Sequence, residues 1–176
     1  MLYAVELFLD EDADRRVRQI WAALDERGVT SLGSTPSTRY HPHVTLSVYE
    51  RGDAAEVAGA LRPVLATTAG LPLPLASLGF FLTEEAPAFL GVVPTSGFLG
   101  LHRAVHHAIE PLVEGIWPYY TPDGLVPHCT LAVGVADTSA VAQTVARFPL
   151  PVRATVRSAQ LVELPGGQRS TPLIMG

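Results

Sequence analysis

A seven-residue stretch occurs twice in the chain, as Pro42-His43-Val44-Thr45-Leu46-Ser47-Val48 and again as Pro127-His128-Cys129-Thr130-Leu131-Ala132-Val133, with five of the seven positions identical. Each copy begins with a proline and is rich in β-branched and apolar residues, which predicts a strand that starts after the proline. Side chains alternate between the faces of a strand, so His43 and Thr45 share one face, as do His128 and Thr130. The chain therefore presents an imidazole beside a hydroxyl twice, an arrangement suited to a cleft.

The segments around the two copies follow a similar order of elements. Their hydrophobic patterns predict a strand at 2–9, a helix from 10 to about 27, the first copy, a helix from 53 to about 67, a hairpin of strands 73–83 and 88–93, a helix from about 96 to 115, the second copy, a helix from 138 to about 147, a strand from 152 to about 164 and a short strand at 173–175. The copies begin 85 residues apart (128 − 43), which indicates two lobes of one domain. We expect an α+β fold over residues 1–176, bilobal and pseudo-two-fold, with two mostly antiparallel sheets backed by helices around a central groove.

The composition is that of a chain that folds around its own core. With 176 residues, of which 48% are hydrophobic, it needs neither disulfides nor a metal to fold. The single cysteine, Cys129, alternates onto the packed face, so we expect a small buried hydrophobe and a reducing, cytoplasmic location. The first residues carry no basic segment, and no apolar run approaches the length of a membrane span, so we expect no export and no membrane insertion. We also expect a monomer.

The charge of the chain limits its partners. The net charge is −5, there is no lysine, and the 12 arginines are scattered along the sequence. A protein that grips a long polyanion needs a basic stripe. The pattern therefore argues against binding of long nucleic acid and favours a small anion or a nucleic-acid end.

Two imidazoles that face each other across a groove can divide acid and base work, because each titrates near neutral pH. In phosphodiester cleavage the neutral ring takes a proton from the attacking oxygen and the protonated ring gives one to the leaving oxygen. The hydroxyls of Thr45 and Thr130 then donate to the non-bridging oxygens. This chemistry requires no metal or other cofactor. His102 and His106 have the i, i+4 spacing of a zinc pair, but without the His-Glu-x-x-His arrangement we expect a solvated or helix-capping role for them.

These residues resemble the 2H phosphoesterase superfamily, which includes the bacterial 2′-5′ RNA ligase-like proteins and cyclic phosphodiesterases. The resemblance rests on His-x-Thr-Leu twice, the second time as Pro-His-Cys-Thr-Leu-Ala, and extends to Tyr-Ala-Val-Glu-Leu-Phe at 3–8, Leu-Gly-Leu-His at 99–102 and Trp-Pro-Tyr-Tyr at 117–120. It implies that His43, Thr45, His128 and Thr130 are the catalytic set, in a groove between two lobes, acting on 2′,3′-cyclic phosphates or 2′-5′ linkages. The C-terminal strand departs from the serine and Gly-Tyr pattern of many ligase-like members, which leaves the substrate subclass open.

Further candidates for substrate binding lie near the two copies. Arg39 and His41 precede the first copy and either contact a phosphate or are polar surface residues. Aromatic side chains before the copies, Tyr40, Tyr119 and Tyr120 with Trp117, either stack on a base or pack as lids on the core.

Two carboxylates stand in otherwise apolar strands. Burial of an unpaired carboxylate is costly, so Glu6 and Glu163 either pair with an arginine such as Arg153 or Arg157 or face the groove and bind a substrate donor.

Two functions of different class remain at this point. One is a metal-independent phosphodiesterase that acts on a small nucleotide cyclic phosphate or an RNA end. The other is a non-catalytic module that binds a nucleotide or RNA end on the same fold. The intact His and Thr in both copies favour the enzyme, because binding alone does not require two titrating groups. The natural substrate, the choice between hydrolysis and ligation, and the division of acid and base roles stay open.

Overall fold

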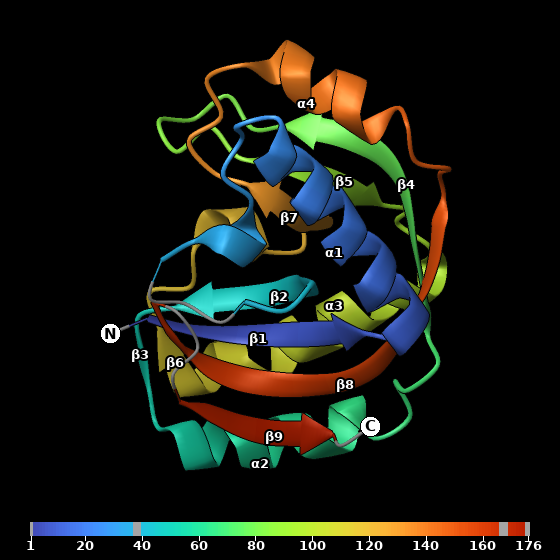
Figure 1. Cartoon of the computed structure of the whole chain (residues 1–176). Coiled ribbons are helices and arrows are strands. Elements are labelled where there is room, and N and C mark those ends of the chain that lie inside the picture. The colour runs from blue at the N-terminus through green and yellow to red at the C-terminus, as the bar shows by residue number, and fades with distance from the viewer. Residues whose placement is uncertain (1, 37–39, 166–168, 175–176) are drawn as a thin grey trace.

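The computed structural model describes residues 2–36, 40–165 and 169–174 (Figure 1). Its strands are β1 (Leu2–Leu9), β2 (His43–Tyr49), β3 (Arg51–Gly52), β4 (Pro72–Phe80), β5 (Ala88–Val92), β6 (Val113–Glu114), β7 (His128–Ala132), β8 (Val152–Leu164) and β9 (Ser170–Ile174). Its α-helices are α1 (Glu11–Glu26), α2 (Ala54–Leu65), α3 (Ser96–Ile109) and α4 (Thr138–Val145), and its 3-10 helices are η1 (Leu32–Ser34), η2 (Glu110–Leu112) and η3 (Pro118–Tyr120). The order of strands and helices is the predicted one, with the short β3 and β6 added.

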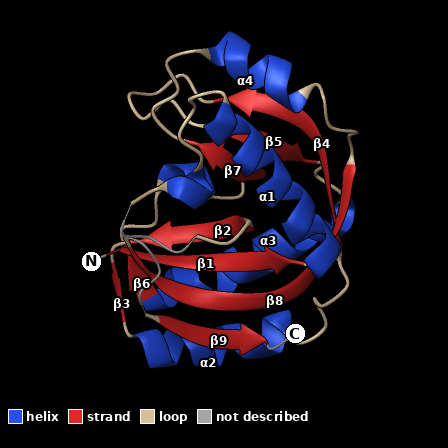
Figure 2. Ribbon diagram, in the orientation of Figure 1, coloured by secondary structure: helices blue, strands red, loops and turns tan. Residues whose placement is uncertain are grey.

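The principal sheet is antiparallel throughout and has seven strands in the order β2-β1-β8-β4-β5-β7, with β9 on the free part of β8. Strand β8 joins the two halves of this sheet. Its first residues, 152–155, pair with β4, and the rest of the strand pairs with β1. The predicted α+β architecture is confirmed, and the two expected sheets share this long curved strand (Figure 2).

The helices cover the two halves separately. Helices α2 and α3 pack together behind the β2-β1-β8-β9 half, and α1 and α4 lie against the half that holds β7 (Figure 1). The two motif strands, β2 and β7, come into contact where the halves meet. The described part of the chain contains no helix with the length and apolarity needed to cross a membrane.

Helix α1 starts at the end of β1 because the carboxylate of Asp10 accepts hydrogen bonds from backbone N–H groups of both α1 and β8. Its Oδ1 accepts from the backbone N–H of Ala13, and its Oδ2 accepts from the backbone N–H of Thr155 in β8 at 2.7 Å. The predicted apolar stripe of this helix is buried, namely Val17, Ile20, Trp21 and Leu24. The Trp21 indole N–H reaches the carbonyl oxygen of Thr130 at 3.4 Å, so α1 packs directly on the second motif strand.

Alternation along the two motif strands is as predicted. Four apolar side chains are fully buried, namely Val44, Leu46, Cys129 and Leu131. The imidazoles and hydroxyls on the opposite face are only partly buried. Burial raises the pKa of the Cys129 thiol to about 12, which confirms the prediction that this residue is a small buried hydrophobe.

The apolar residues at helical spacing in the third helical segment, Leu101, Val105, Ala108 and Leu112, all pack on the core, with Val105 buried and the other three partly buried. The buried residues of α3 also include Phe98, His102 and Ile109. The prediction of a solvated or capping role was wrong for His102, which is 2% exposed and whose Nε2 lies 2.9 Å from the carbonyl oxygen of Tyr120. This hydrogen bond satisfies the polar side of the ring inside the core, which pattern reading alone does not reveal.

Candidate functional site

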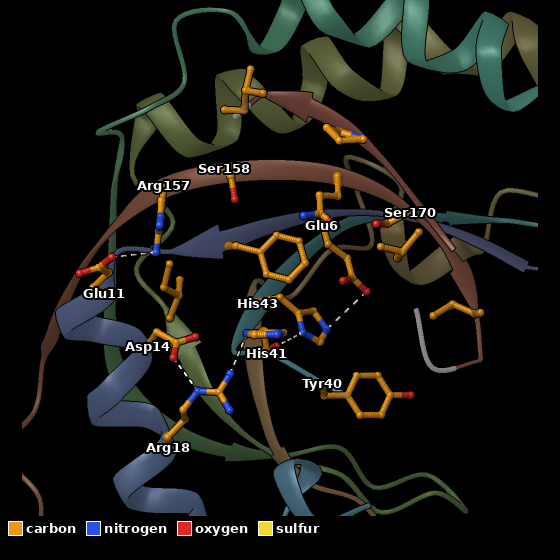
Figure 3. A pocket seen from close by; sticks show the side chains of 17 residues that line it. Glu6, Glu11, Asp14, Arg18, Tyr40, His41, His43, Arg157, Ser158 and Ser170 are labelled. Atoms are coloured by element: carbon orange, nitrogen blue, oxygen red, sulfur yellow. Dashed lines mark hydrogen bonds and ion pairs between the residues drawn. The ribbon is translucent and has the colours of Figure 1, made fainter. Parts of the chain in front are cut away.

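A groove of about 890 Å³ lies over the outer face of the β1-β8-β9 half, with α1 along one side (Figure 3). This volume is larger than a single nucleotide occupies. The groove is lined by Glu6, Phe8, Leu9, Glu11, Asp14, Arg18, Tyr40, His41, His43, Arg157, Ser158, Gln160, Val162, Leu164, Ser170, Pro172 and Ile174. It therefore opens directly onto the imidazole of the first motif.

The His43 ring is held by the backbone just before it. Its Nδ1 lies 2.7 Å from the carbonyl oxygen of His41, and because a carbonyl can only accept, Nδ1 is the donor. The Nε2 atom is then the one that points away from the strand and is available for proton transfer.

The His128 ring is held in the same way. Its Nδ1 lies 2.7 Å from the carbonyl oxygen of Val126, again two residues earlier in the chain. The duplicated stretch therefore repeats a geometry as well as a sequence: each imidazole is locked through Nδ1 and presents Nε2.

The two imidazoles interact electrostatically. Burial lowers the pKa of His128, the hydrogen bond to Val126 opposes this, and the charge of His43 lowers the pKa further. The Cys129 thiol also lies against the backbone of His43, so the two motif strands touch directly. One ring therefore responds to the charge of the other, as a shared acid and base pair requires.

The surroundings of the two rings are different. Glu6 Oε1 lies 3.6 Å from Nε2 of His43, with both side chains almost buried at 9% and 11% exposure. His128 instead packs against the adjoining rings of Phe81 and Phe89, with centroid distances of 5.0 and 5.2 Å. One imidazole therefore faces a carboxylate and the other an apolar wall.

The register of the sheet explains this difference. In β1, Glu6 is opposite Thr45, and in β5, Phe89 is opposite Thr130. The two positions are equivalent with respect to their motifs, but one carries a carboxylate and the other a phenyl ring. Both threonines are half-buried and share the face of their histidine, although neither they nor His128 line the groove.

The predicted substrate-binding residues lie in different environments. Tyr40 lines the groove, with its ring stacked 6.2 Å from the ring of His43. Tyr120 packs with Trp117 against the small cluster of Ala4, Val48 and Val162, as the lid interpretation requires. Burial, followed by the charge of Glu6, raises the pKa of Tyr120 to about 12, which indicates that its hydroxyl is near that carboxylate.

The other residues predicted for this region either do not line the groove or lie outside the described residues. Tyr119 is 68% exposed and does not line it. Arg39 lies outside the described residues, and so do Gly166, Gly167 and Met175 of the predicted C-terminal hairpin. Glu163 is half-buried and is also not among the residues that line the groove.

Two arginines line the groove that the sequence did not single out as substrate-binding residues, although Arg157 was a candidate partner for a carboxylate. Arg18 reaches His41 and Asp14, and Arg157 pairs with Glu11 rather than with Glu6. The i, i+3 and i+7 spacing of Glu11, Asp14 and Arg18 on one predicted helix was the available signal, but it is common on solvated helix faces. Within residues 2–36, 40–165 and 169–174, no three His, Cys, Asp or Glu side chains form a group that could hold a metal ion.

The fold is shared with several solved structures of low sequence identity. Escherichia coli LigT complexed with 3′-AMP is 16% identical, with a TM-score of 0.62 over 97% of this chain and 93% of that one. A structure described as a phosphoesterase is 17% identical, with a TM-score of 0.60 over the same shares. Kluyveromyces marxianus Usb1 with uridine monophosphate is 16% identical, with a TM-score of 0.54 over 98% of this chain and 97% of that one.

The sequence itself identifies the family. No curated protein matches the chain in sequence. The family model of the 2′-5′ RNA ligase superfamily matches residues 9–168, which include both copies of the duplicated stretch and most of the described fold. The chain therefore belongs to the 2′-5′ RNA ligase superfamily.

Proposed function

We propose that the chain is a metal-independent phosphodiesterase that cleaves 2′,3′-cyclic phosphate or 2′-5′ phosphodiester bonds of small nucleotides or RNA ends. The observation that carries this proposal is the repeated geometry of the two imidazoles. Each is locked through Nδ1 to a carbonyl 2.7 Å away, and the charge of one affects the other. A pair of rings with free Nε2 atoms supplies one base and one acid.

The surroundings of the rings support a division of these roles. Burial against the rings of Phe81 and Phe89 lowers the pKa of His128, which favours the neutral ring, so we assign the base role to His128. The carboxylate of Glu6 lies 3.6 Å from Nε2 of His43, where it can pair with an imidazolium, so we assign the acid role to His43. In hydrolysis of a 2′,3′-cyclic phosphate, His128 takes a proton from water, the water oxygen bonds to phosphorus, and one ribose P–O bond breaks. His43 gives its proton to the ribose oxygen that leaves.

In this proposal the two motif threonines bind the reacting phosphate. Thr45 and Thr130 lie two residues after their histidines on the same strand faces. Their hydroxyls donate to the non-bridging oxygens, on which negative charge develops in the transition state. The alternative is a module that only binds a nucleotide or RNA end with the same four side chains. The fixed orientation of the two Nε2 atoms favours catalysis over this alternative.

A substrate panel tests the proposal. The purified chain is incubated with nucleoside 2′,3′-cyclic phosphates, 2′-5′ dinucleotides and ADP-ribose cyclic phosphate, each with and without EDTA. We expect ring opening or cleavage of at least one of these, at the same rate in EDTA. Binding without turnover of any compound would support the binding module, and a loss of rate in EDTA that zinc or manganese restores would support a metal-dependent phosphoesterase.

A further inference from the structure

Two arginines and a third imidazole gather on the α1 side of the groove (Figure 3). Arg18 Nε lies 2.6 Å from Asp14 Oδ1, and its Nη2 lies 2.7 Å from Nδ1 of His41. Arg157 Nη1 lies 3.2 Å from Glu11 Oε1. Glu11 and Asp14 are three residues apart on α1 and so lie on one face of the helix, which places the two guanidinium groups near each other.

The His41 side chain is oriented as a donor toward the groove. A guanidinium has only donors, so Nδ1 of His41 accepts from Arg18 and the ring proton is on Nε2. The backbone of the same residue holds the ring of His43, and its own ring meets Phe8 edge-on at 6.4 Å. His41 is an exposed residue that lines the groove, and its Nε2–H remains as a donor for a ligand.

The arginines retain donors for a ligand. Arg18 uses Nε and Nη2 in the contacts above, and Arg157 uses Nη1, out of five N–H groups on each guanidinium. Their side chains are 40% and 48% exposed, and ion pairs at such positions contribute little to stability. The carboxylates thus orient the guanidinium groups and leave several of their N–H donors without a partner among these contacts.

The two arginines of this set lie on α1 and β8, and His41 connects them to the first motif, because its carbonyl oxygen holds the ring of His43. The groove is larger than one phosphate and one ribose require, and it extends from His43 toward α1 and β8. Several donors with two permanent positive charges suit an anion with several oxygens, and a phosphate is the anion that planar guanidinium groups bind best.

We propose that Arg18, His41 and Arg157 form a second phosphate subsite, which selects substrates that carry a phosphate besides the one that reacts. This inference rests on the proposed phosphodiesterase function and narrows its substrate class. Two kinds of compound carry the required group: a nucleoside 2′,3′-cyclic phosphate with a 5′-phosphate, and an RNA end in which a phosphodiester precedes the cyclic phosphate.

The test compares kcat/KM on three substrates: adenosine 2′,3′-cyclic phosphate, the same compound with a 5′-phosphate, and the dinucleotide ApA with a terminal 2′,3′-cyclic phosphate. The variants are Arg18→Gln, Arg157→Gln and His41→Phe, with His41→Gln to restore a donor. Arg15→Gln is the matched control, because Arg15 is also on α1 and also pairs with a carboxylate, Asp12, but does not line the groove. The ratio of kcat/KM values cancels any general damage to the enzyme.

We expect the wild type to prefer a substrate with the second phosphate by about 10- to 100-fold, the range of one or two charge-assisted hydrogen bonds. The ratio should fall toward one in Arg18→Gln, Arg157→Gln and His41→Phe, recover in His41→Gln, and stay unchanged in Arg15→Gln. Preference for the 5′-phosphate compound or for the dinucleotide tells which source of phosphate fits. A wild-type ratio near one, or a ratio that survives both arginine substitutions, would overturn the subsite.

Failure of the proposed function is recognised separately. If none of the three substrates is cleaved, the subsite is tested by binding alone. Isothermal titration calorimetry then compares the dissociation constants of adenosine 5′-monophosphate and adenosine. Tighter binding of the monophosphate to the wild type, lost in Arg157→Gln and kept in Arg15→Gln, supports it. Equal affinities for the two compounds contradict it.

Discussion

The carboxylate of Glu6 faces the imidazole of His43, with Oε1 3.6 Å from Nε2 and both side chains almost buried. The equivalent position opposite the second motif holds Phe89, whose ring packs 5.2 Å from that of His128. A duplicated motif thus lies in two unlike surroundings. The two rings therefore differ in their electrostatic surroundings, and burial lowers the pKa of His128.

Replacement of Glu6 by Gln removes the carboxylate while keeping its shape. In the proposed mechanism this charge stabilises the protonated form of His43, so we expect kcat to fall about tenfold, the effect of roughly 1.4 kcal/mol on a barrier. The KM should change little. Glu163→Gln is the control, because Glu163 is in the neighbouring strand but does not line the groove. Steady-state kinetics that show an unchanged kcat for Glu6→Gln would remove this residue from the mechanism.

The pH dependence of the rate tests whether the aromatic residues around His128, namely Phe81 and Phe89, set the pKa of this ring. Burial lowers the pKa of this ring, so as the proposed base it stays neutral until the pH falls below its usual value of about 6.5. The acidic limb of kcat/KM should therefore lie below pH 6.5. Phe81→Ala should admit water and move that limb upward toward 6.5, with the alkaline limb in place.

The control for this experiment is Leu82→Ala, since Leu82 is adjacent to Phe81 in sequence and 98% exposed. It should leave both limbs where they are. An acidic limb above pH 6.5 in the wild type, or one that Phe81→Ala does not move, would show that the aromatic wall does not set the protonation of the base.

Buried His102 makes stability depend on pH. Burial lowers its pKa, with hydrogen bonds to Tyr120 and Leu46 opposing the shift in part. The unfolded chain therefore binds a proton at this histidine at a higher pH than the folded chain does. The contribution of neutral His102 to the free energy of unfolding is complete above pH 6.5 and decreases as the pH falls. His102→Gln keeps a donor for the Tyr120 carbonyl but does not titrate. Thermal unfolding at pH 5 and pH 8 should show a smaller difference for this variant, and an equal difference would disprove the contribution of His102.

The sequence predicted most of the fold because its local signals agree. The apolar run of β1, the helical spacing of apolar residues in α1 before Gly28, and the strand at 152–164 are each bounded by clear breakers. The pairing of β8 with both β1 and β4 was not predictable, since it depends on how one long strand curves between two halves. The burial of His102 in α3 was missed because a histidine was counted as polar, whereas its hydrogen bond to the carbonyl oxygen of Tyr120 allows it to pack inside.

The same limit applies to the site. Duplication singled out His43, Thr45, His128 and Thr130, because a repeat makes an isolated pattern informative. The partners of the histidines come from distant segments, with Glu6 in β1 and Phe81 after β4, and only tertiary structure brings them together. Tyr40 and Tyr119 look alike in sequence, yet the chain path puts only the first of them in the groove.

The threonines are expected to contribute to the transition state rather than to the fold. Thr45→Ala and Thr130→Ala should each lower turnover by roughly 10²-fold, the scale for one donor aimed at developing charge. Each side chain is half-buried on the motif face, so unfolding temperatures should stay close to that of the wild type. Full turnover in either variant, with normal stability, would rule out phosphate contact by that hydroxyl.

The central claim is that His43 and His128 act together as one acid and base unit. The measurement that tests it most directly is the kcat of His43→Ala, His128→Ala and the double variant on the best cyclic phosphate, with the dissociation constant determined in parallel. We expect each single change to lower kcat by about 10² to 10⁴, and the double change to cost far less than the product of the two. The dissociation constants should change much less, and the wild-type rate should be bell-shaped in pH. Equal losses of affinity and rate, with a flat pH profile, would contradict the account.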